Sequence, residues 1–177
     1  MSSTEKLSSA MRQELILKSL KEEQRPITGS EFAEKSNVSR QVIVQDVSIL
    51  KAKNEPIIAT SQGYMYIKKT TDEAAHKVII ACKHNPEQTQ KELTIIVDHG
   101  VTVKDVTVEH PVYGDLTASL MVSNRHEVEQ FIKRIQDTKA AYLSSLTEGI
   151  HMHTLEADSQ AKINAACKDL QATGILL

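Results

Sequence analysis

The stretch TGSEFAEKSNVSRQVIVQDVSIL, residues 28–50, has the pattern of two short helices joined by a tight turn. Thr28 can cap the first helix while Glu31 reaches back to it, which is the arrangement of a capping box. Asn37 tolerates the left-handed conformation that ends a helix, and Ser39 can cap the next one. Two helices separated by about four residues in this way are typical of a helix-turn-helix.

The second of these helices has an apolar face and a polar face. Ile43, Val47 and Leu50 recur at helical spacing and predict a buried stripe. Arginine and glutamine on the opposite face carry donors and acceptors that match the edges of guanine and adenine in the major groove, and a serine can contact phosphate. The residues of this helix that we expect to contact DNA are Ser39, Arg40, Gln41, Val44, Gln45 and Ser48.

The flanking segments complete a winged helix-turn-helix. A preceding helix is predicted from the apolar spacing of Met11, Leu15, Ile16 and Leu20. Residues 57–60 and 64–67 flank a glycine-bearing turn at 61–63 and predict a hairpin, the wing. Lys68, at the base of this hairpin, is expected to contact a backbone phosphate. Such a module can also bind protein, but its element order, caps and charge favour DNA.

Length and charge fit a chain of two parts. Its 177 residues suit one large or two small domains. Residues 1–69 contain 11 Lys and Arg against 8 Asp and Glu, whereas residues 70–177 contain 10 against 15. The basic first part can approach phosphates, and the acidic remainder would repel them. We therefore expect a DNA-binding domain over 1–69 and a separate domain over 70–177.

Several features predict a cytoplasmic protein without a membrane partner. No apolar run approaches the roughly 20 residues of a membrane span. Charges are spread through the N-terminal residues 1–18, which is unlike a signal peptide. Cys82 and Cys167 lie within apolar patterns and are expected to be buried free thiols of a reduced compartment.

The second domain is expected to be an α+β open-faced sandwich with the order βαββαβα. Its strands are predicted at 76–83, 101–109, 115–122 and 150–155. Its helices are predicted to begin at Pro86, Ser123 and Asp158. Short antiparallel strands with helices collected on one face give this architecture, and the order resembles the fold of the phosphocarrier HPr.

Four residues of this domain could form a metal site. His151 and His153 are two apart in a predicted strand, so both point to one side of the sheet. His84 ends the first strand, and Glu92 lies about two turns into the helix that follows. Three imidazoles and a carboxylate suit a divalent transition metal such as nickel, zinc or iron. From spacing alone, an ordinary polar strand face is the simpler interpretation, because only the assumed topology joins His84 and Glu92 to the pair.

Four segments carry a resemblance that covers essentially the whole chain: SNVSRQVIVQDVSIL (36–50), HNPEQTQKEL (84–93), VEHPVYGDL (108–116) and LTEGIHMHTLEA (146–157). With them, the chain resembles the niacin-responsive bacterial repressors of NAD-biosynthesis and niacin-transport genes. Those proteins have a winged helix followed by a regulatory domain named for three histidines. The resemblance implies that His84, Glu92, His151 and His153 are metal ligands, and it outweighs the simpler interpretation.

The resemblance also implies a repressor of transcription with nicotinic acid as corepressor. The carboxylate of nicotinic acid could complete the coordination of the metal or accept hydrogen bonds beside it. His110 and Tyr113 are candidates for lining its pocket, although the turn that contains them is equally consistent with a structural role. A homodimer on double-stranded operator DNA is expected, because one winged helix covers only a half-site.

Three alternative functions compete with this one. A metal with an open position could activate water in an enzyme, but no nucleophile or general base has convincing spacing, so we do not expect an enzyme. A regulator that senses the metal itself is compatible with the sequence. The third is a transcription factor controlled by phosphorylation of His84, which precedes a helix N-terminus where phosphate could bind.

Overall fold

A computed structural model describes residues 7–67 and 75–177. The chain divides into two compact units, Met1–Thr70 and Thr71–Leu177. Lys68, the expected phosphate contact at the base of the hairpin, lies outside the described residues. Each unit is described by itself below.

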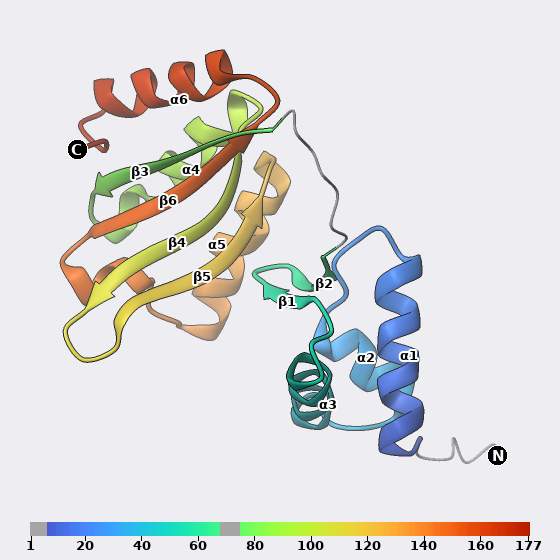
Figure 1. The fold of residues 1–177 in the computed structure, drawn as a ribbon. Helices are drawn as coiled ribbons and strands as arrows, with labels where there is room; N and C mark the ends of the chain where they lie inside the picture. Colours follow the sequence, from blue (N-terminus) through green and yellow to red (C-terminus); the bar gives the residue numbers. More distant parts are fainter. Residues whose placement is uncertain (1–6, 68–74) are drawn as a thin grey trace. The chain divides into compact units, whose positions relative to one another are not determined.

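The first unit consists of three helices and a two-stranded hairpin (Figure 1). Its elements are α1 (Ser9–Glu22), α2 (Gly29–Ser36), α3 (Arg40–Ala52), β1 (Ile57–Thr60) and β2 (Gly63–Tyr66). The two strands pair antiparallel, and the backbone of Tyr64 also pairs with that of Ile27 ahead of α2. The hairpin is therefore tied to the helices by backbone hydrogen bonds as well as by packing.

The caps predicted for the helix-turn-helix are confirmed. Thr28 accepts a hydrogen bond from the Glu31 amide, and the Glu31 carboxylate accepts one from the Thr28 amide, which completes the capping box. Asn37 ends α2 in the left-handed conformation with φ of 50°. Ser39 caps α3 by accepting a hydrogen bond from the Val42 amide. Local side-chain chemistry thus sets both ends of the turn.

At the start of α1 a charged residue, and not its apolar neighbour, is part of the core. Met11 is 55% exposed, and Arg12 is buried. The Arg12 guanidinium points toward α3, where it pairs with the buried carboxylate of Asp46. A polar contact, rather than the methionine, therefore occupies the interface between the two helices at this level.

The second unit is a four-stranded antiparallel sheet with three helices. Its elements are β3 (His76–Lys83), α4 (Thr89–Asp98), β4 (Thr102–His110), β5 (Gly114–Val122), α5 (Arg125–Thr138), β6 (Ile150–Ala157) and α6 (Gln160–Ala172). A short 3₁₀ turn, Pro86–Gln88, precedes α4, and another, Leu143–Thr147, precedes β6. The strand order across the sheet is β3-β6-β4-β5, so the last strand lies between the first two.

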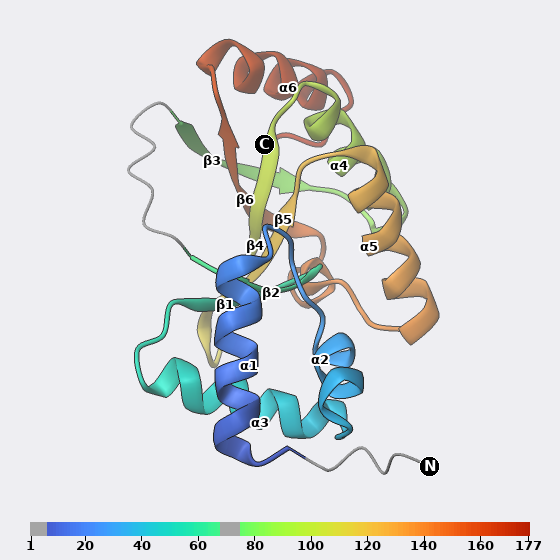
Figure 2. The same ribbon diagram turned by 90° about the vertical axis from the view of Figure 1, so that its right-hand side faces the viewer.

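Helices α4, α5 and α6 lie against one face of this sheet (Figures 1 and 2). Alternate residues of β6 are buried toward that face: His151, His153, Leu155 and Ala157. The same face carries the apolar side chains that pack against the three helices. The two strand histidines therefore lie at one end of a row that continues into the apolar core.

Two helix caps in this unit differ from the predicted ones by one residue. Asn124, not Ser123, caps α5 by accepting a hydrogen bond from the Glu127 amide. Likewise Ser159, not Asp158, caps α6. In both places two adjacent residues are good caps, and the backbone geometry selects the second.

Within residues 7–67 and 75–177, none of the helices has the length and apolar content needed to cross a bilayer.

Candidate functional site

Helix α3 presents a polar surface in the first unit. Arg40, Gln41 and Gln45 are exposed on it, and Val44 is half-buried between them. Ser39 is exposed but is engaged as the cap of the helix. The hydroxyl of Ser48 donates to the Val44 carbonyl one turn earlier, so it would have to break that bond to contact phosphate.

A buried ion pair fixes α3 to α1 and was not recognised from the sequence. Arg12 Nε donates to Asp46 Oδ2 over 2.6 Å, and Ser9 Oγ donates to Asp46 Oδ1 over 2.8 Å. Arg12 Nη1 also donates to the carbonyl of Leu7. Asp46 is 1% exposed. Its position between Ile43 and Val47 on the apolar face of α3 is the signal that could have revealed it.

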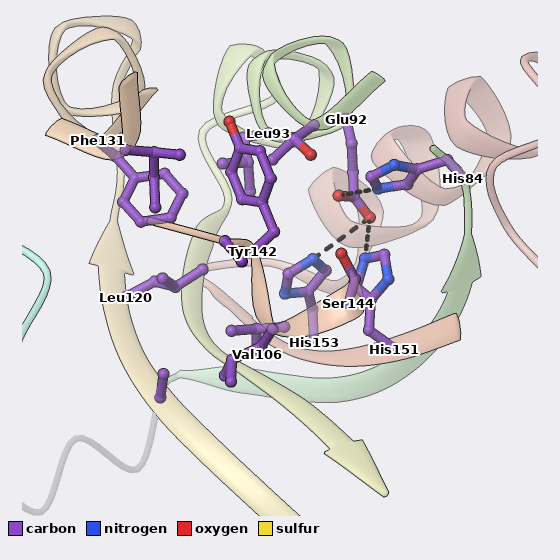
Figure 3. Close-up of a pocket in the computed structure, with 15 residues that line it drawn as sticks. His84, Glu92, Leu93, Val106, Leu120, Phe131, Tyr142, Ser144, His151 and His153 are labelled. Atoms are coloured by element: carbon purple, nitrogen blue, oxygen red, sulfur yellow. Dashed lines mark hydrogen bonds and ion pairs between the residues drawn. The ribbon is translucent and has the colours of Figure 1, made fainter. Parts of the chain in front are cut away.

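The second unit brings together the four residues that we expected to bind a metal (Figure 3). Glu92, on α4, lies at the centre of the cluster. His84 Nε2 lies 2.6 Å from Glu92 Oε2, and His151 Nε2 lies 2.9 Å from Glu92 Oε1. His153 Nε2 lies 3.3 Å from the same Oε1. All four residues are buried.

The topology explains this convergence. His84 directly follows β3, and β6 pairs with β3 so that Cys82 is opposite His151. Helix α4 then returns across the same face of the sheet and presents Glu92 to the histidines. Residues 59 positions apart in sequence, Glu92 and His151, are in this way brought into contact.

Backbone carbonyls hold all three imidazoles in one tautomer. The Nδ1 atoms of His84, His151 and His153 lie 2.7, 2.9 and 2.7 Å from backbone carbonyl oxygens, so each Nδ1 must donate a hydrogen. The three Nε2 atoms are then left to face Glu92. Metal-binding histidines commonly have their second nitrogen held in this way.

The cluster requires positive charge. Burial disfavours the ionised form of Glu92, but its contacts with the three histidines outweigh burial and hold the Glu92 pKa well below its usual range. Burial lowers the pKa of His84 and His153, yet their contacts with Glu92 dominate, and both pKa values end above the ordinary value. Protons or a metal ion could supply the charge. His153 Nε2 is buried and, among the described residues, has no hydrogen-bond partner of proper geometry.

Cys82 is a further potential ligand that was not anticipated. Its sulfur, a carboxylate oxygen of Glu92 and a ring nitrogen of His151 lie within 4.8 Å of one another, so this buried group could hold a metal ion. Burial, followed by the Glu92 charge, raises the pKa of the Cys82 thiol. The thiol is therefore protonated at neutral pH unless a cation displaces its proton.

Gly149 makes the close approach of the histidine segments possible. Its φ of +91° is in the left-handed region, and a Cβ at this position would lie 2.2 Å from the carbonyl oxygen of His84. The Gly149 carbonyl accepts hydrogen bonds from the His84 amide and from His151 Nδ1. A glycine two residues before His151 was the sequence signal for this contact.

A cavity of about 180 Å³ opens beside the cluster. The three histidines and Glu92 line one part of it (Figure 3). The remaining wall is mostly apolar and includes Leu93, Val106, Leu120, Phe131, Tyr142 and Ser144. A pocket with an apolar body and a few convergent polar groups is typical of a small-molecule site.

The structure does not place His110 and Tyr113 in this cavity. His110 is the last residue of β4, and Tyr113 lies in the turn that follows, where it is 76% exposed. His110 Nδ1 accepts hydrogen bonds from the amides of Val112 and Tyr113. The histidine therefore stabilises its own turn, and neither residue lines the cavity beside the cluster.

Comparisons with known proteins agree with the two-part architecture. Residues 12–65 match an HTH domain, and residues 77–177 match a 3H domain. "Transcription repressor NadR" of Bacillus subtilis (strain 168) is 57% identical over 173 residues, which cover 97% of this chain and 96% of that protein. "Probable transcription repressor NiaR" of Thermotoga maritima is 35% identical over 162 residues, 92% of this chain and 91% of that one.

The fold and these relatives define a transcription repressor with a DNA-binding HTH domain, and not an enzyme. The chain belongs to the NadR/NiaR family of transcription repressors with HTH and 3H domains.

Proposed function

We propose that this repressor binds operator DNA through α3 and uses nicotinic acid as its corepressor, bound beside a divalent metal in the 3H domain. The metal is held by His84, Glu92, His151 and His153. The observation that carries this proposal is the convergence of three Nε2 atoms on one buried carboxylate. Each of these imidazoles is locked by a carbonyl at its other nitrogen.

The donor set fits nickel, zinc or iron. Imidazole nitrogens suit all three, and the carboxylate supplies negative charge to a dication. The buried Nε2 of His153 contacts Glu92 Oε1 over 3.3 Å but has no hydrogen-bond partner of proper geometry among the described residues, so it is available as a ligand atom. Cys82 could supply a sulfur ligand in place of one histidine. When bound, the metal would supply a Lewis-acidic cation to which an anionic ligand is attracted.

The cavity fits one small aromatic ring. An engineered apolar cavity of about 150 Å³ in another protein holds benzene, and the cavity here has about 180 Å³. Its apolar wall suits the ring, and the histidine cluster, with its bound cation, suits the carboxylate. These two features support an aromatic carboxylate such as nicotinic acid.

The geometry at His84 disfavours control by a phosphohistidine. Its Nδ1 donates to the carbonyl of Asn85, and its Nε2 contacts Glu92. Its side chain is 1% exposed, so a phosphodonor could not reach either nitrogen without unfolding the site.

We further propose that the repressor acts as a cytoplasmic homodimer with residues 1–69 as DNA-binding domain and 70–177 as regulatory domain. Operators with two half-sites are read by dimers, whose symmetry matches that of the site. The exposed face of α3 would then enter the major groove of each half-site, with Arg40, Gln41 and Gln45 toward the bases.

Replacing Arg40 and Gln41 together by alanine should abolish specific operator binding. Each bidentate base contact is worth about 1–3 kcal/mol of discrimination, so the double variant should bind operator and random DNA almost equally. Fluorescence anisotropy with both duplexes measures this. Lys18→Ala, an exposed basic residue of α1, is the control and should retain specificity. Full specificity in the double variant would show that α3 is not the reading helix.

Nicotinic acid should tighten operator binding by metal-loaded repressor. Couplings between two sites are typically about 5–150-fold, and operator affinity should rise by a factor in this range. Nicotinamide, which lacks the carboxylate, should act more weakly at equal concentration. The measurement is operator affinity with metal alone, with metal plus each compound, and with His84→Ala.

Reciprocity gives a second test, because operator DNA must tighten nicotinic acid binding by the same factor. Unchanged operator affinity at saturating nicotinic acid would contradict the corepressor role. If the metal alone produces the full affinity, the metal itself is the signal.

A further inference from the structure

One hydroxyl in the wall of the cavity has no partner. Thr89 is 7% exposed and lines the cavity. Its Oγ1 is buried, and no group in the described part of the chain lies within hydrogen-bonding distance in suitable geometry. Buried side-chain hydroxyls in proteins nearly always have a partner. A ligand group in the cavity would provide one.

Thr89 shares a helix face with residues already assigned to the site. It is the first residue of α4, three positions before Glu92 and four before Leu93, and all three line the cavity. Residues three or four apart on a helix have Cβ atoms about 5–6 Å from each other. The hydroxyl is therefore one helical turn away from the carboxylate at the centre of the histidine cluster.

Helix capping does not account for this hydroxyl. The N-cap position of α4 is Gln88, and no side-chain hydrogen bond caps the helix there. The preceding 3₁₀ turn, whose N-cap is Asn85, has no side-chain cap either. Valine would fill the same space as threonine without burying an unpaired polar atom, so packing does not require the hydroxyl.

We propose that Thr89 selects the ligand of the cavity by donating a hydrogen bond from Oγ1 to the ring nitrogen of a pyridine carboxylate. The proposal rests on the proposed function, in which the carboxylate of the ligand meets the histidine cluster. In this pose the six-membered ring would bridge the hydroxyl and the histidine cluster. Thr89 is thus a specificity-determining residue, and the cavity distinguishes a pyridine ring from a benzene ring.

The selection has a physical basis in the cost of unpaired polar groups. Benzoate has the shape and charge of nicotinate but has no ring acceptor, so it would leave the buried hydroxyl unpaired. Sites built to form a hydrogen bond reject analogues that lack the matching group. We expect this hydroxyl to contribute a factor of about ten to the ratio of the dissociation constants of benzoate and nicotinate.

The test is a cycle of two proteins and two ligands. Dissociation constants of nicotinate and benzoate are measured by calorimetry with the full, metal-loaded chain, for the wild type and for Thr89→Val. The preference for nicotinate should fall about tenfold in Thr89→Val. Thr89→Ser keeps a hydroxyl and should restore most of the preference. Thr94→Val, a half-buried threonine of the same helix that does not line the cavity, should leave it unchanged.

The outcomes separate the two proposals. If the wild type binds both ligands equally well, the role of Thr89 is overturned while the proposed function stands. The role of Thr89 is also overturned if Thr89→Val lowers the affinities for nicotinate and benzoate equally, at unchanged metal content and thermal stability. If neither nicotinate nor benzoate binds to the wild type, the proposed function is overturned together with this inference.

Discussion

Asp46→Ala should destabilise the first unit by about 3–5 kcal/mol, because it leaves the Arg12 guanidinium buried without its anion. The carboxylate also accepts the hydroxyl hydrogen of Ser9, so the Arg12 guanidinium and the Ser9 hydroxyl lose this partner at once. Helix α3 is held to α1 through this carboxylate. Operator binding should therefore be lost as well, although Asp46 does not lie on the exposed face of α3.

Hydrogen exchange measured by mass spectrometry checks this, because it reports each unit separately. Peptides of α1 and α3 should lose protection, and peptides of the second unit should not. The control is Asp98→Ala, which breaks an exposed pair with Arg125 and should change little. Replacing both Arg12 and Asp46 by apolar residues should restore much of the loss. Undiminished protection in Asp46→Ala would mean that the ion pair does not stabilise the unit.

Replacing His151 and His153 together by alanine should reduce metal affinity by more than about 100-fold. Loss of a group that merely orients a ligand already costs roughly 10–100-fold, and this variant removes two proposed ligands. Metal content after purification and competition with a chelator measure the effect. His110→Ala is the matched control, since this histidine lies at the end of β4 and outside the cavity.

Single variants then identify the ligand set. If Cys82 binds the metal with Glu92 and His151, Cys82→Ser should release it and His153→Ala should retain it. If the metal is instead bound by His84, Glu92, His151 and His153, then His153→Ala should release it and Cys82→Ser should retain it. One equivalent of tightly bound metal in the double variant would contradict a site at the histidine cluster.

Local sequence predicted the elements and the caps of the first unit because the hydrogen bonds involved span three or four residues. Thr28, Glu31 and Ser39 satisfy backbone amides within one turn of themselves, whatever the rest of the chain does. The same holds for the pairing of His151 with His153 on one strand face, which follows from alternation alone. The errors at the starts of α5 and α6 are single-residue shifts between adjacent good caps.

The grouping of side chains from distant segments was decided only by the tertiary structure. Glu92 and His151 meet across 59 residues, and Arg12 and Asp46 across 34, because strand order and helix packing bring them together. The same packing gives Thr89 a buried position facing the cavity and leaves Tyr113 exposed. Periodicity specifies which side of an element is buried but not what faces it, since a contact between elements depends on register and packing that no single segment encodes.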